Sequence, residues 1–395
     1  MLSTKAVTFG YKPTPEVMEV FATFRTMCNN AIRIAIATDA KSRFDLITNS
    51  YKHLKGFDLH SHYILNACEI AYAIFQRSRR EASEEVRQIL TLPHFRKAGI
   101  LQHLARLGVR IPYVKRPFLK LDSETCKLDY LLLRIPTTPR HFVFIVLNGG
   151  MHQRAILADR SLKRGSVTLT ETSVIISFTH QIEEIKSSGQ MGIDVNLLNV
   201  TWSDSSGVTE RVDISEVPEI KERYRSLRVV LGRVTNKDRR AGSFLQQKYG
   251  EREHNRCVQC LHRITKGMVE HAKAQAMIIK MEKLTGIRRL YRKGNNQGTL
   301  YRGRMNTWMF GEIQRQIEYK AAWEGIPVVY VNPRGTSRIC LCGSRVTDIG
   351  NRQLCCSVCG KIWDRDELAS KNIMAAPLVR AARPFKGSDD GGTRR

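Results

Sequence analysis

Residues 191–204 have the sequence MGIDVNLLNVTWSD, in which the carboxylate of Asp194 interrupts an otherwise apolar run. Apolar residues bounded by turn formers predict a buried β-strand here, followed by a turn at residues 204–207. A carboxylate buried without a partner is costly, so Asp194 needs a cation or hydrogen-bond donors beside it. A buried salt bridge is the structural alternative to a functional role for this side chain.

Two further acids lie at predicted boundaries of strands and helices. Glu282 follows the apolar run AMIIKM at the end of a predicted strand, where ligand sites lie in open α/β sheets. Asp366 belongs to DRDELASKNI, at the start of a predicted helix. The structural alternatives are a solvated strand end for Glu282 and a helix N-cap for Asp366. Taken singly, none of the three acids defines a site.

Two close pairs of cysteines, CLCG at residues 340–343 and CSVCG at 356–360, lie between the second and third acids. This clustering favours metal binding over disulfides in a reducing compartment. Four thiolates with no open coordination position predict a structural Zn²⁺ site, with an unmetallated hairpin as the alternative. The first pair has a single residue between its cysteines, which excludes the usual knuckle and leaves Cys355 as a substitute ligand. The predicted ligands are Cys340, Cys342, Cys356 and Cys359.

The other cysteines have a different predicted environment. Cys257 and Cys260 have metal-ligand spacing, but they lie in a predicted helix with no second pair nearby, which favours small buried thiols. Cys28, Cys68 and Cys126 are predicted to lie in the core.

The charge of the chain indicates its class of partner. Its 395 residues include 64 Lys and Arg against 37 Asp and Glu, a net charge of +27 that repels itself unless a polyanion neutralises it. A nucleic acid is therefore the predicted partner, and a ribosome-associated or membrane-surface protein is the alternative. No apolar run reaches 18 residues and the N-terminus has no apolar signal core, so we expect a cytosolic protein without a membrane span.

The pattern along the chain changes twice. A strand at AVTFGYK precedes a helical stretch over residues 16–110, and short alternating runs over 111–178 then predict a small β-barrel or sandwich. A long basic helical region follows at residues 214–276. One amphipathic helix is predicted over residues 304–325, with an apolar stripe of Met305, Trp308, Met309, Ile313, Ile317 and Ala321.

A basic segment, RRLYRKGNNQGTLYRGR at residues 288–304, directly follows Glu282 and is predicted to be a loop. Cations interleaved with aromatic residues suit a single nucleic-acid strand, because phosphates pair with Arg and bases stack on rings. A solvated loop is the equal alternative. The candidate contacts are Arg288, Arg289, Tyr291, Arg292, Lys293, Tyr301, Arg302 and Arg304.

The order of these motifs resembles the split RuvC domain of the transposon-encoded TnpB nucleases. The matching features are GID-x-N, a strand ending in Glu before Leu, and DRD-x-x-A-x-x-NI after paired cysteines. The resemblance implies that Asp194, Glu282 and Asp366 are the three catalytic acids, with Asp364 the less favoured third acid. Such acids hold two Mg²⁺ (or Mn²⁺) ions that neutralise charge during phosphodiester cleavage. The sequence DELAS departs from the Asn-Ala-Ala continuation that is usual in the family.

The resemblance also implies a multidomain α+β protein. An N-terminal wedge β-barrel would hold a helical recognition insertion, and an RNase H-like (RuvC) α/β domain would hold a zinc ribbon. The implied ranges are 1–12 and 111–185 for the barrel, 13–110 for recognition, 186–333 and 362–378 for RuvC, 334–361 for the ribbon and 379–395 for a disordered tail.

The implied function is RNA-guided endonucleolytic cleavage of DNA beside a short flanking motif. The implied partners are a guide RNA and target double-stranded DNA, with no membrane partner, in a monomeric protein of the prokaryotic cytoplasm associated with the nucleoid. The alternatives are a compact type V CRISPR effector, a guided DNA-binding repressor without cleavage and a strand-joining transposase.

Overall fold

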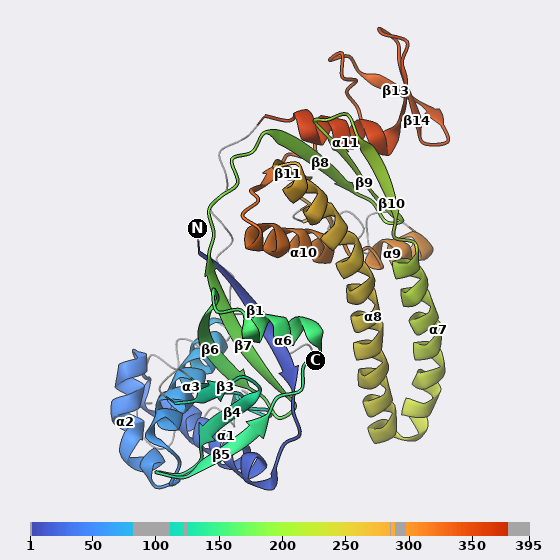
Figure 1. Cartoon of the computed structure of the whole chain (residues 1–395). Helices are drawn as coiled ribbons and strands as arrows, with labels where there is room; N and C mark the ends of the chain where they lie inside the picture. The colour runs from blue at the N-terminus through green and yellow to red at the C-terminus, as the bar shows by residue number, and fades with distance from the viewer. Residues whose placement is uncertain (1, 82–110, 122–124, 285, 289–297, 378–395) are drawn as a thin grey trace. The chain divides into compact units, whose positions relative to one another are not determined.

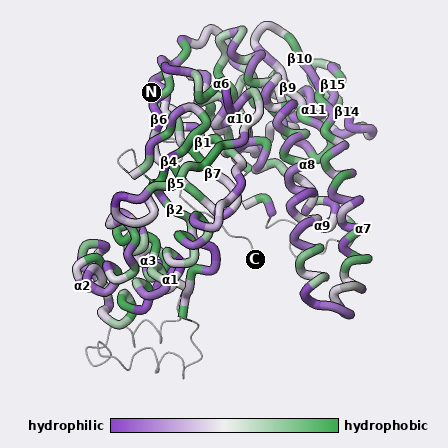
Figure 2. The backbone as a smooth tube through the Cα atoms, turned by 60° about the horizontal axis from the view of Figure 1, so that its bottom comes forward, coloured by the Kyte–Doolittle hydropathy of each residue, from purple (hydrophilic) through white to green (hydrophobic). Residues whose placement is uncertain are grey.

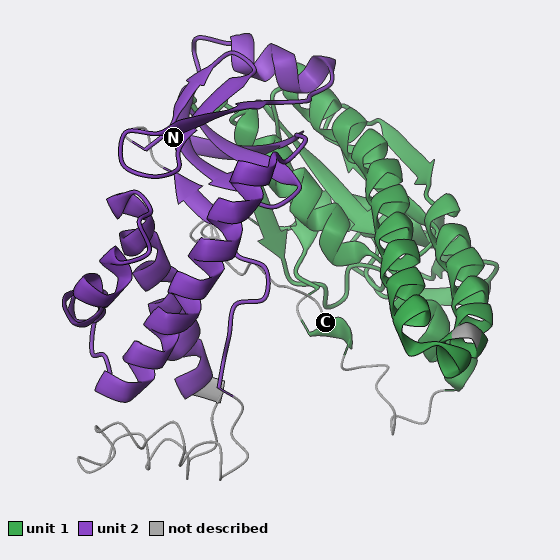
Figure 3. Ribbon diagram, turned by 90° about the horizontal axis from the view of Figure 1, so that it is seen from below, with its two compact units in different colours: residues 1, 181–395 green, residues 2–180 purple. Residues whose placement is uncertain are grey.

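The computed structural model describes residues 2–81, 111–121, 125–284, 286–288 and 298–377. The chain divides into two compact units, Leu2–His180 and Gln181–Arg395 (Figure 3). The predicted disordered tail at 379–395 lies outside the described residues, as does the part of the predicted helical stretch at 82–110. Among the described residues, no helix has the length and apolar character needed to cross a membrane.

The first unit begins with a strand and three helices. Strand β1 (Leu2–Gly10) is followed by α1 (Pro15–Thr38), α2 (Arg43–Lys55) and α3 (Ser61–Glu81), so the helical prediction is confirmed up to residue 81. Thr14 caps α1 by accepting a hydrogen bond from the Val17 amide, and Pro15 suits the first helical position because its missing N–H has no partner there. Helix α1 contacts both α2 and α3.

Two sheets form the rest of the first unit. One has the order β1-β7-β6-β2, with β2 (Leu119–Leu121), β6 (Lys163–Leu169) and β7 (Ser173–Gln181). The other is antiparallel, with the order β3-β4-β5 from β3 (Lys127–Asp129), β4 (Leu132–Pro136) and β5 (Phe142–Val146). A helix that the sequence did not predict, α6 (Met151–Ala158), follows β5. The barrel remains a prediction.

The sheet of the second unit has the order β10-β9-β8-β11-β12. Strands β8 (Gly189–Val195), β9 (Asn199–Asp204) and β10 (Thr209–Asp213) form an antiparallel meander, whereas β11 (Met277–Glu282) and β12 (Val328–Val331) run parallel to β8. The prediction of one strand over residues 191–204 is therefore wrong. The chain reverses after Val195, where the Asn196 amide bonds to the Asn199 carbonyl and the Asn196 side chain also bonds locally.

Helices cover both faces of this sheet. Helices α7 (Glu216–Lys237) and α8 (Arg239–Ala274) form a long hairpin in which hydrophilic and hydrophobic residues alternate (Figure 2). On β8 and β11 the apolar residues of odd number, such as Met191 and Met281, belong to a core shared with α8 and with α10 (Phe310–Trp323). The opposite face is covered by α11 (Arg365–Ala375), as Figure 1 shows.

The predicted single helix over residues 304–325 is two helices, α9 (Thr299–Asn306) and α10. The break follows Thr307, whose amide and hydroxyl both donate to the Arg304 carbonyl and so close α9. Tyr301, Arg302 and Arg304 therefore lie on a helix and not in the predicted loop. Of the predicted stripe, Met305 lies before the break, and Ile313, Ile317 and Ala321 are buried in the core.

A small antiparallel sheet of β13 (Val346–Gly350), β14 (Gln353–Cys356) and β15 (Ile362–Asp364) lies between β12 and α11 in the sequence. Strand β15 continues directly into α11. This sheet and the cysteines beside it are called the ribbon below.

Candidate metal sites

Asp194 and Glu282 lie side by side at the carboxyl ends of neighbouring parallel strands. The register of β8 and β11 pairs Ile193 with Met281, so the next residue on each strand is one of these acids. Successive side chains of a strand point to opposite faces, so both acids project toward the face that α11 covers.

Helix α11 brings the third acid to the same place. A side chain at Gly192 would overlap backbone atoms of Ser370 and Met374, so α11 lies directly against β8 at this glycine. Asp366 is one helical turn before Ser370, and Asp194 is two residues beyond Gly192 on the same face of β8. Asp366 is 1% exposed, and its charge acts on that of Asp194.

The electrostatics of the site are those of crowded carboxylates. The pKa of Asp194 is raised to about 7, chiefly by burial and also by the charges of Glu282 and Asp366, while the hydrogen bond from Asn196 acts to lower it. The Asn196 amide donates to Asp194 Oδ2 over 2.7 Å. Burial also raises the pKa of Glu282, while the Thr336 hydroxyl donates to Glu282 Oε1 over 2.5 Å and lowers it. A cation between these groups would relieve the repulsion.

Two arginines, which the sequence did not single out, reach Asp366. Arg352, from the turn between β13 and β14, donates to Asp366 Oδ1 and pairs with it. Arg211 on β10 lies 3.5 Å from Asp366 Oδ2, which accepts no hydrogen bond within the described part of the chain. No local sequence signal marks either arginine, because each meets Asp366 only through the folded sheet.

Asp364 is the N-cap residue of α11 and not a buried acid of the site. Its side chain accepts hydrogen bonds from the amides of Asp366 and Glu367 and thereby caps α11. The N-cap that was the structural alternative for Asp366 is thus supplied by Asp364, while Asp366 lies inside the first turn with its carboxylate buried.

Lys280 and Asn372 fix α11 from two sides. Lys280, 1% exposed within β11, donates through Nζ to the carbonyls of Met374 (2.7 Å) and Ala376 at the end of α11. Burial lowers the pKa of this ammonium group. Asn372 donates to the carbonyls of Thr336 and Ile339, each over 2.7 Å, and so holds the segment that leads into the ribbon. The position of Asp366 is therefore set by packing and by polar contacts together.

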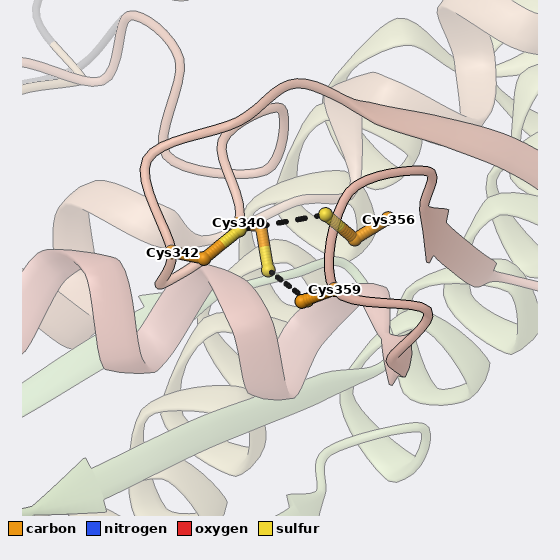
Figure 4. A group of neighbouring side chains, drawn as sticks. All are labelled: Cys340, Cys342, Cys356 and Cys359. Carbon is orange, nitrogen blue, oxygen red and sulfur yellow. Dashed lines mark hydrogen bonds between the residues drawn. The ribbon is translucent and has the colours of Figure 1, made fainter.

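The four predicted cysteines converge in the ribbon, as Figure 4 shows. Their Sγ atoms all lie within 4.8 Å of one another, with 3.6 Å between Cys340 and Cys359 and 3.5 Å between Cys342 and Cys356. Tetrahedral Zn²⁺ with Zn–S bonds of ~2.3 Å needs Sγ–Sγ separations of ~3.8 Å, which these distances approach. The single residue between Cys340 and Cys342 therefore does not prevent convergence, and Cys355 is not part of the group.

Two features stabilise the cysteine cluster. Gly343 donates its amide to the Cys340 carbonyl with φ at 89°, a conformation that favours glycine. The indole N–H of Trp363 donates to Cys340 Sγ over 3.3 Å, and the Lys361 ammonium lies 3.9 Å from the centre of that indole ring. Cys355 is half-buried, and the five other cysteines outside the cluster are buried, as predicted. They are Cys28, Cys68, Cys126, Cys257 and Cys260.

Four of the eight predicted nucleic-acid contacts, Arg288, Tyr301, Arg302 and Arg304, lie among the residues that the structure describes. The guanidinium of Arg288 lies 5.7 Å from the centre of the Phe310 ring, and Arg302 donates to the Thr299 hydroxyl within α9. Tyr301 is half exposed on α9. The other predicted contacts, Arg289, Tyr291, Arg292 and Lys293, lie outside the described residues.

The chain is similar to known proteins over most of its length. Residues 310–373 match the family model described as "Cas12f1-like, TNB domain". A TnpB-like protein of Methanocaldococcus jannaschii is 33% identical over 271 residues, which cover 66% of this chain and 92% of that protein. The CRISPR-associated endodeoxyribonuclease Cas12f2 of a Micrarchaeota archaeon is 29% identical over 167 residues, which cover 40% of this chain and 29% of that protein.

Among solved structures, the fold resembles that of the mini-RNA-guided endonuclease CRISPR-Cas phi3. The TM-score is 0.52 at 9% identity, over 95% of this chain and 93% of that one. At this identity the similarity concerns the fold alone.

Proposed function

The chain belongs to the TnpB-like protein family, and on that premise we propose that it is a transposon-associated, RNA-guided DNA endonuclease. Its guide RNA would select the target by base pairing, and cleavage would fall beside a short flanking DNA motif. The name of one similar protein, a CRISPR-associated endodeoxyribonuclease, supports the nuclease part of this proposal.

One observation carries the nuclease part of the proposal. Asp194 and Glu282 end adjacent parallel strands, and α11 adds Asp366 above them, so that three acids from distant parts of the chain share one electrostatic environment. An antiparallel meander followed by parallel strands, with helices on both faces, supports an RNase H-like (RuvC) domain. All three acids are present, which favours a nuclease over a guided repressor.

In this proposal Asp194, Glu282 and Asp366 hold two Mg²⁺ ions, or Mn²⁺. Carboxylate oxygens are the ligands these hard cations prefer, and the mutual repulsion of the acids fits a cation between them. When bound, such ions neutralise charge on the attacking and leaving oxygens of the phosphodiester.

The other residues of the site orient these ligands. The Asn196 amide fixes one oxygen of Asp194, and the Thr336 hydroxyl fixes one oxygen of Glu282. Arg352 and Arg211 hold Asp366 and offset its negative charge. These contacts limit the rotation of the carboxylates, as a preorganised site requires.

We assign a structural role to the cysteines. Zn²⁺ held by Cys340, Cys342, Cys356 and Cys359 would have no open position for substrate, so it would stabilise the ribbon and the entry into α11. The first unit would supply the wedge β-barrel and recognition helices. The basic residues of 288–304 would contact nucleic acid, and the protein would act as a monomer in the prokaryotic cytoplasm, associated with the nucleoid.

The test begins with the protein purified from cells that carry its gene. Sequencing the bound RNA should return one defined RNA, and DNA matched to it should be cut only with Mg²⁺ or Mn²⁺. Asp194→Ala should bind this DNA as the wild type does and lose cleavage by about 10²–10³-fold or more, because one essential charge is removed.

Glu210→Gln, which changes an exposed acid of β10, serves as the matched control and should cut normally. Cleavage by Asp194→Ala at the wild-type rate would remove Asp194 from the site. Tight RNA-matched binding by the wild type without any cutting would identify a repressor instead. An RNA transcribed from a repeat array would place the protein among CRISPR effectors.

A further inference from the structure

The sheet β3-β4-β5 carries apolar side chains on both faces. Leu133, Ile135 and Ile145 point inward and are at most 2% exposed. The outward positions of β5 are also apolar: Phe142 is 46% exposed and Phe144 is 58% exposed. An antiparallel sheet with one face on the core normally presents polar side chains to water, so this outer face needs an explanation. We call four exposed residues and one half-buried residue of this face the aromatic strip: Leu132, Phe142, Phe144 and Val146 are exposed, and Arg134 is half-buried.

The strand register places cations among these rings. Phe144 pairs with Arg134 on β4, and Arg134 in turn pairs with Lys127 on β3, so an aromatic ring and two cations form one row. The Arg134 guanidinium also lies 4.3 Å from the centre of the Phe142 ring. The acid of this face, Asp129, lies in the neighbouring row, opposite Leu132.

The aromatic strip is open along its outer edge. In the described part of the chain, β5 pairs with β4 alone and ends the sheet on that side. On the other side, Arg164 of β6 donates to the Leu128 carbonyl of β3 over 2.6 Å, which brings a further cation beside the sheet. Aromatic rings lie at the open edge of the sheet, and cations lie behind them. This arrangement suits a nucleic-acid strand, because its flat bases can stack on the rings while its phosphates pair with the cations.

We propose that the aromatic strip binds an unpaired segment of RNA by stacking its bases on Phe142 and Phe144. Alternate residues of a strand are ~6.6–6.8 Å apart, a separation that two successive bases of an extended strand can span. Aromatic side chains on an exposed sheet face stack bases in this way in other RNA-binding modules, and cations beside them pair with the phosphates. The choice of RNA over single-stranded DNA rests on the proposed function, in which the chain holds a guide RNA.

The test measures binding in the full-length Asp194→Ala protein, freed of RNA, so that cleavage does not interfere. The probe is fluorescently labelled oligo(U), and its duplex with oligo(A) is the control whose bases are not free to stack. The variant Phe142→Ala with Phe144→Ala should weaken oligo(U) binding by about tenfold or more and leave duplex binding unchanged. Oligo(dT) as a second probe separates RNA from single-stranded DNA.

Two matched variants separate stacking from general apolar contact. Phe142→Leu with Phe144→Leu keeps the strip apolar and should weaken oligo(U) binding as the alanine pair does, whereas a Trp pair should retain it. Phe44→Ala removes another highly exposed aromatic ring of the same unit and should have no effect. Wild-type binding by the leucine pair or by the alanine pair would overturn the proposal.

Ultraviolet crosslinking locates the contact. Crosslinks of oligo(U) should fall in the tryptic peptide 141–154, and their absence from it would overturn the proposal. A wild-type dimer in sedimentation that the alanine pair converts to monomer would instead assign the strip to contacts between copies. The purified protein could carry no RNA and cut no DNA while the crosslinks to oligo(U) still appear. That result would contradict the proposed function but support RNA binding by the aromatic strip.

Discussion

The cysteine cluster and the carboxylate site differ in how the chain brings their residues together. The four thiols come from one hairpin, residues 340–359, and their Sγ atoms lie within 4.8 Å of one another. The three acids come from two strands and a helix, and burial, together with the charges of Glu282 and Asp366, raises the pKa of Asp194 to about 7. The first site is built by local turns, whereas the second depends on the packing of α11 against β8.

The two sites are nonetheless connected. Trp363, which donates to Cys340 Sγ, lies on the strand that leads into α11, and Arg352 from the ribbon turn pairs with Asp366. A change that disorders the ribbon should therefore displace Asp366. A substitution of Asp194, in contrast, should leave the cysteines in place. This asymmetry can be tested from both sides.

The largest expected effect is that of a lost thiolate. Cys340→Ser should reduce bound zinc from about one ion per chain to about none, because structural Zn²⁺ sites depend on all four ligands. Cleavage should fall as well, because Arg352 and the start of α11 lose their support. Metal analysis and the cleavage rate measure the two effects.

Cys355→Ser is the matched control, since this neighbouring thiol is not part of the cluster, and it should keep its zinc. Asp194→Ala should also keep its zinc. A Cys340→Ser protein with full zinc content, or a loss of zinc in Cys355→Ser, would contradict the assignment of the ligands.

A smaller effect should follow from removing the buried charge of Asp194, which burial and the neighbouring acids both disfavour. Because the pKa of Asp194 rises from 3.8 to about 7 on folding, the folded chain keeps a proton that the unfolded chain releases between these values. The contribution of Asp194 to stability therefore falls as the pH rises through this window. In magnesium-free buffer Asp194→Asn should raise the free energy of unfolding by up to about 4 kcal/mol near pH 8, and by less near pH 5.

Denaturant unfolding of both proteins at the two pH values measures this difference. Equal effects at both pH values, or a loss of stability in Asp194→Asn near pH 8, would show that folding does not raise the pKa of Asp194.

The smallest effect concerns the contact between α11 and β8. Gly192→Ala should push α11 outward, because the new methyl group overlaps the backbone of Ser370 and Met374. We expect a loss of about 1–3 kcal/mol in the free energy of unfolding, a lower cleavage rate and unchanged zinc content. Gly311→Ala, at a helical glycine with open space around it, is the control. Full activity in Gly192→Ala would show that Asp366 does not depend on this packing.

Sequence patterns predicted the local features of both sites well. The paired cysteines, the strand ending at Glu282 and the helix that carries Asp366 all appear where the motifs placed them. The pattern also identified the Cys257 and Cys260 thiols as buried in a helix. Each of these depends on residues close together in the sequence, where spacing carries the information.

What depended on tertiary contacts was not predictable. The reversal after Val195 was missed, because the run from Leu197 to Val200 is as apolar as a continuous strand. The break after Thr307 was missed for the same reason, since the helical period continues across it. Arg211 and Arg352 could not be singled out among 64 basic residues, because only the fold brings them to Asp366.

The most direct test of the central claim, that three distant acids share divalent cations, is a crystal structure of the protein grown with Mn²⁺. The anomalous signal of manganese should appear between Asp194, Glu282 and Asp366, and it should disappear from this place in Asp194→Ala. A map with no manganese among these carboxylates, or one that Asp194→Ala leaves unchanged, would contradict the account.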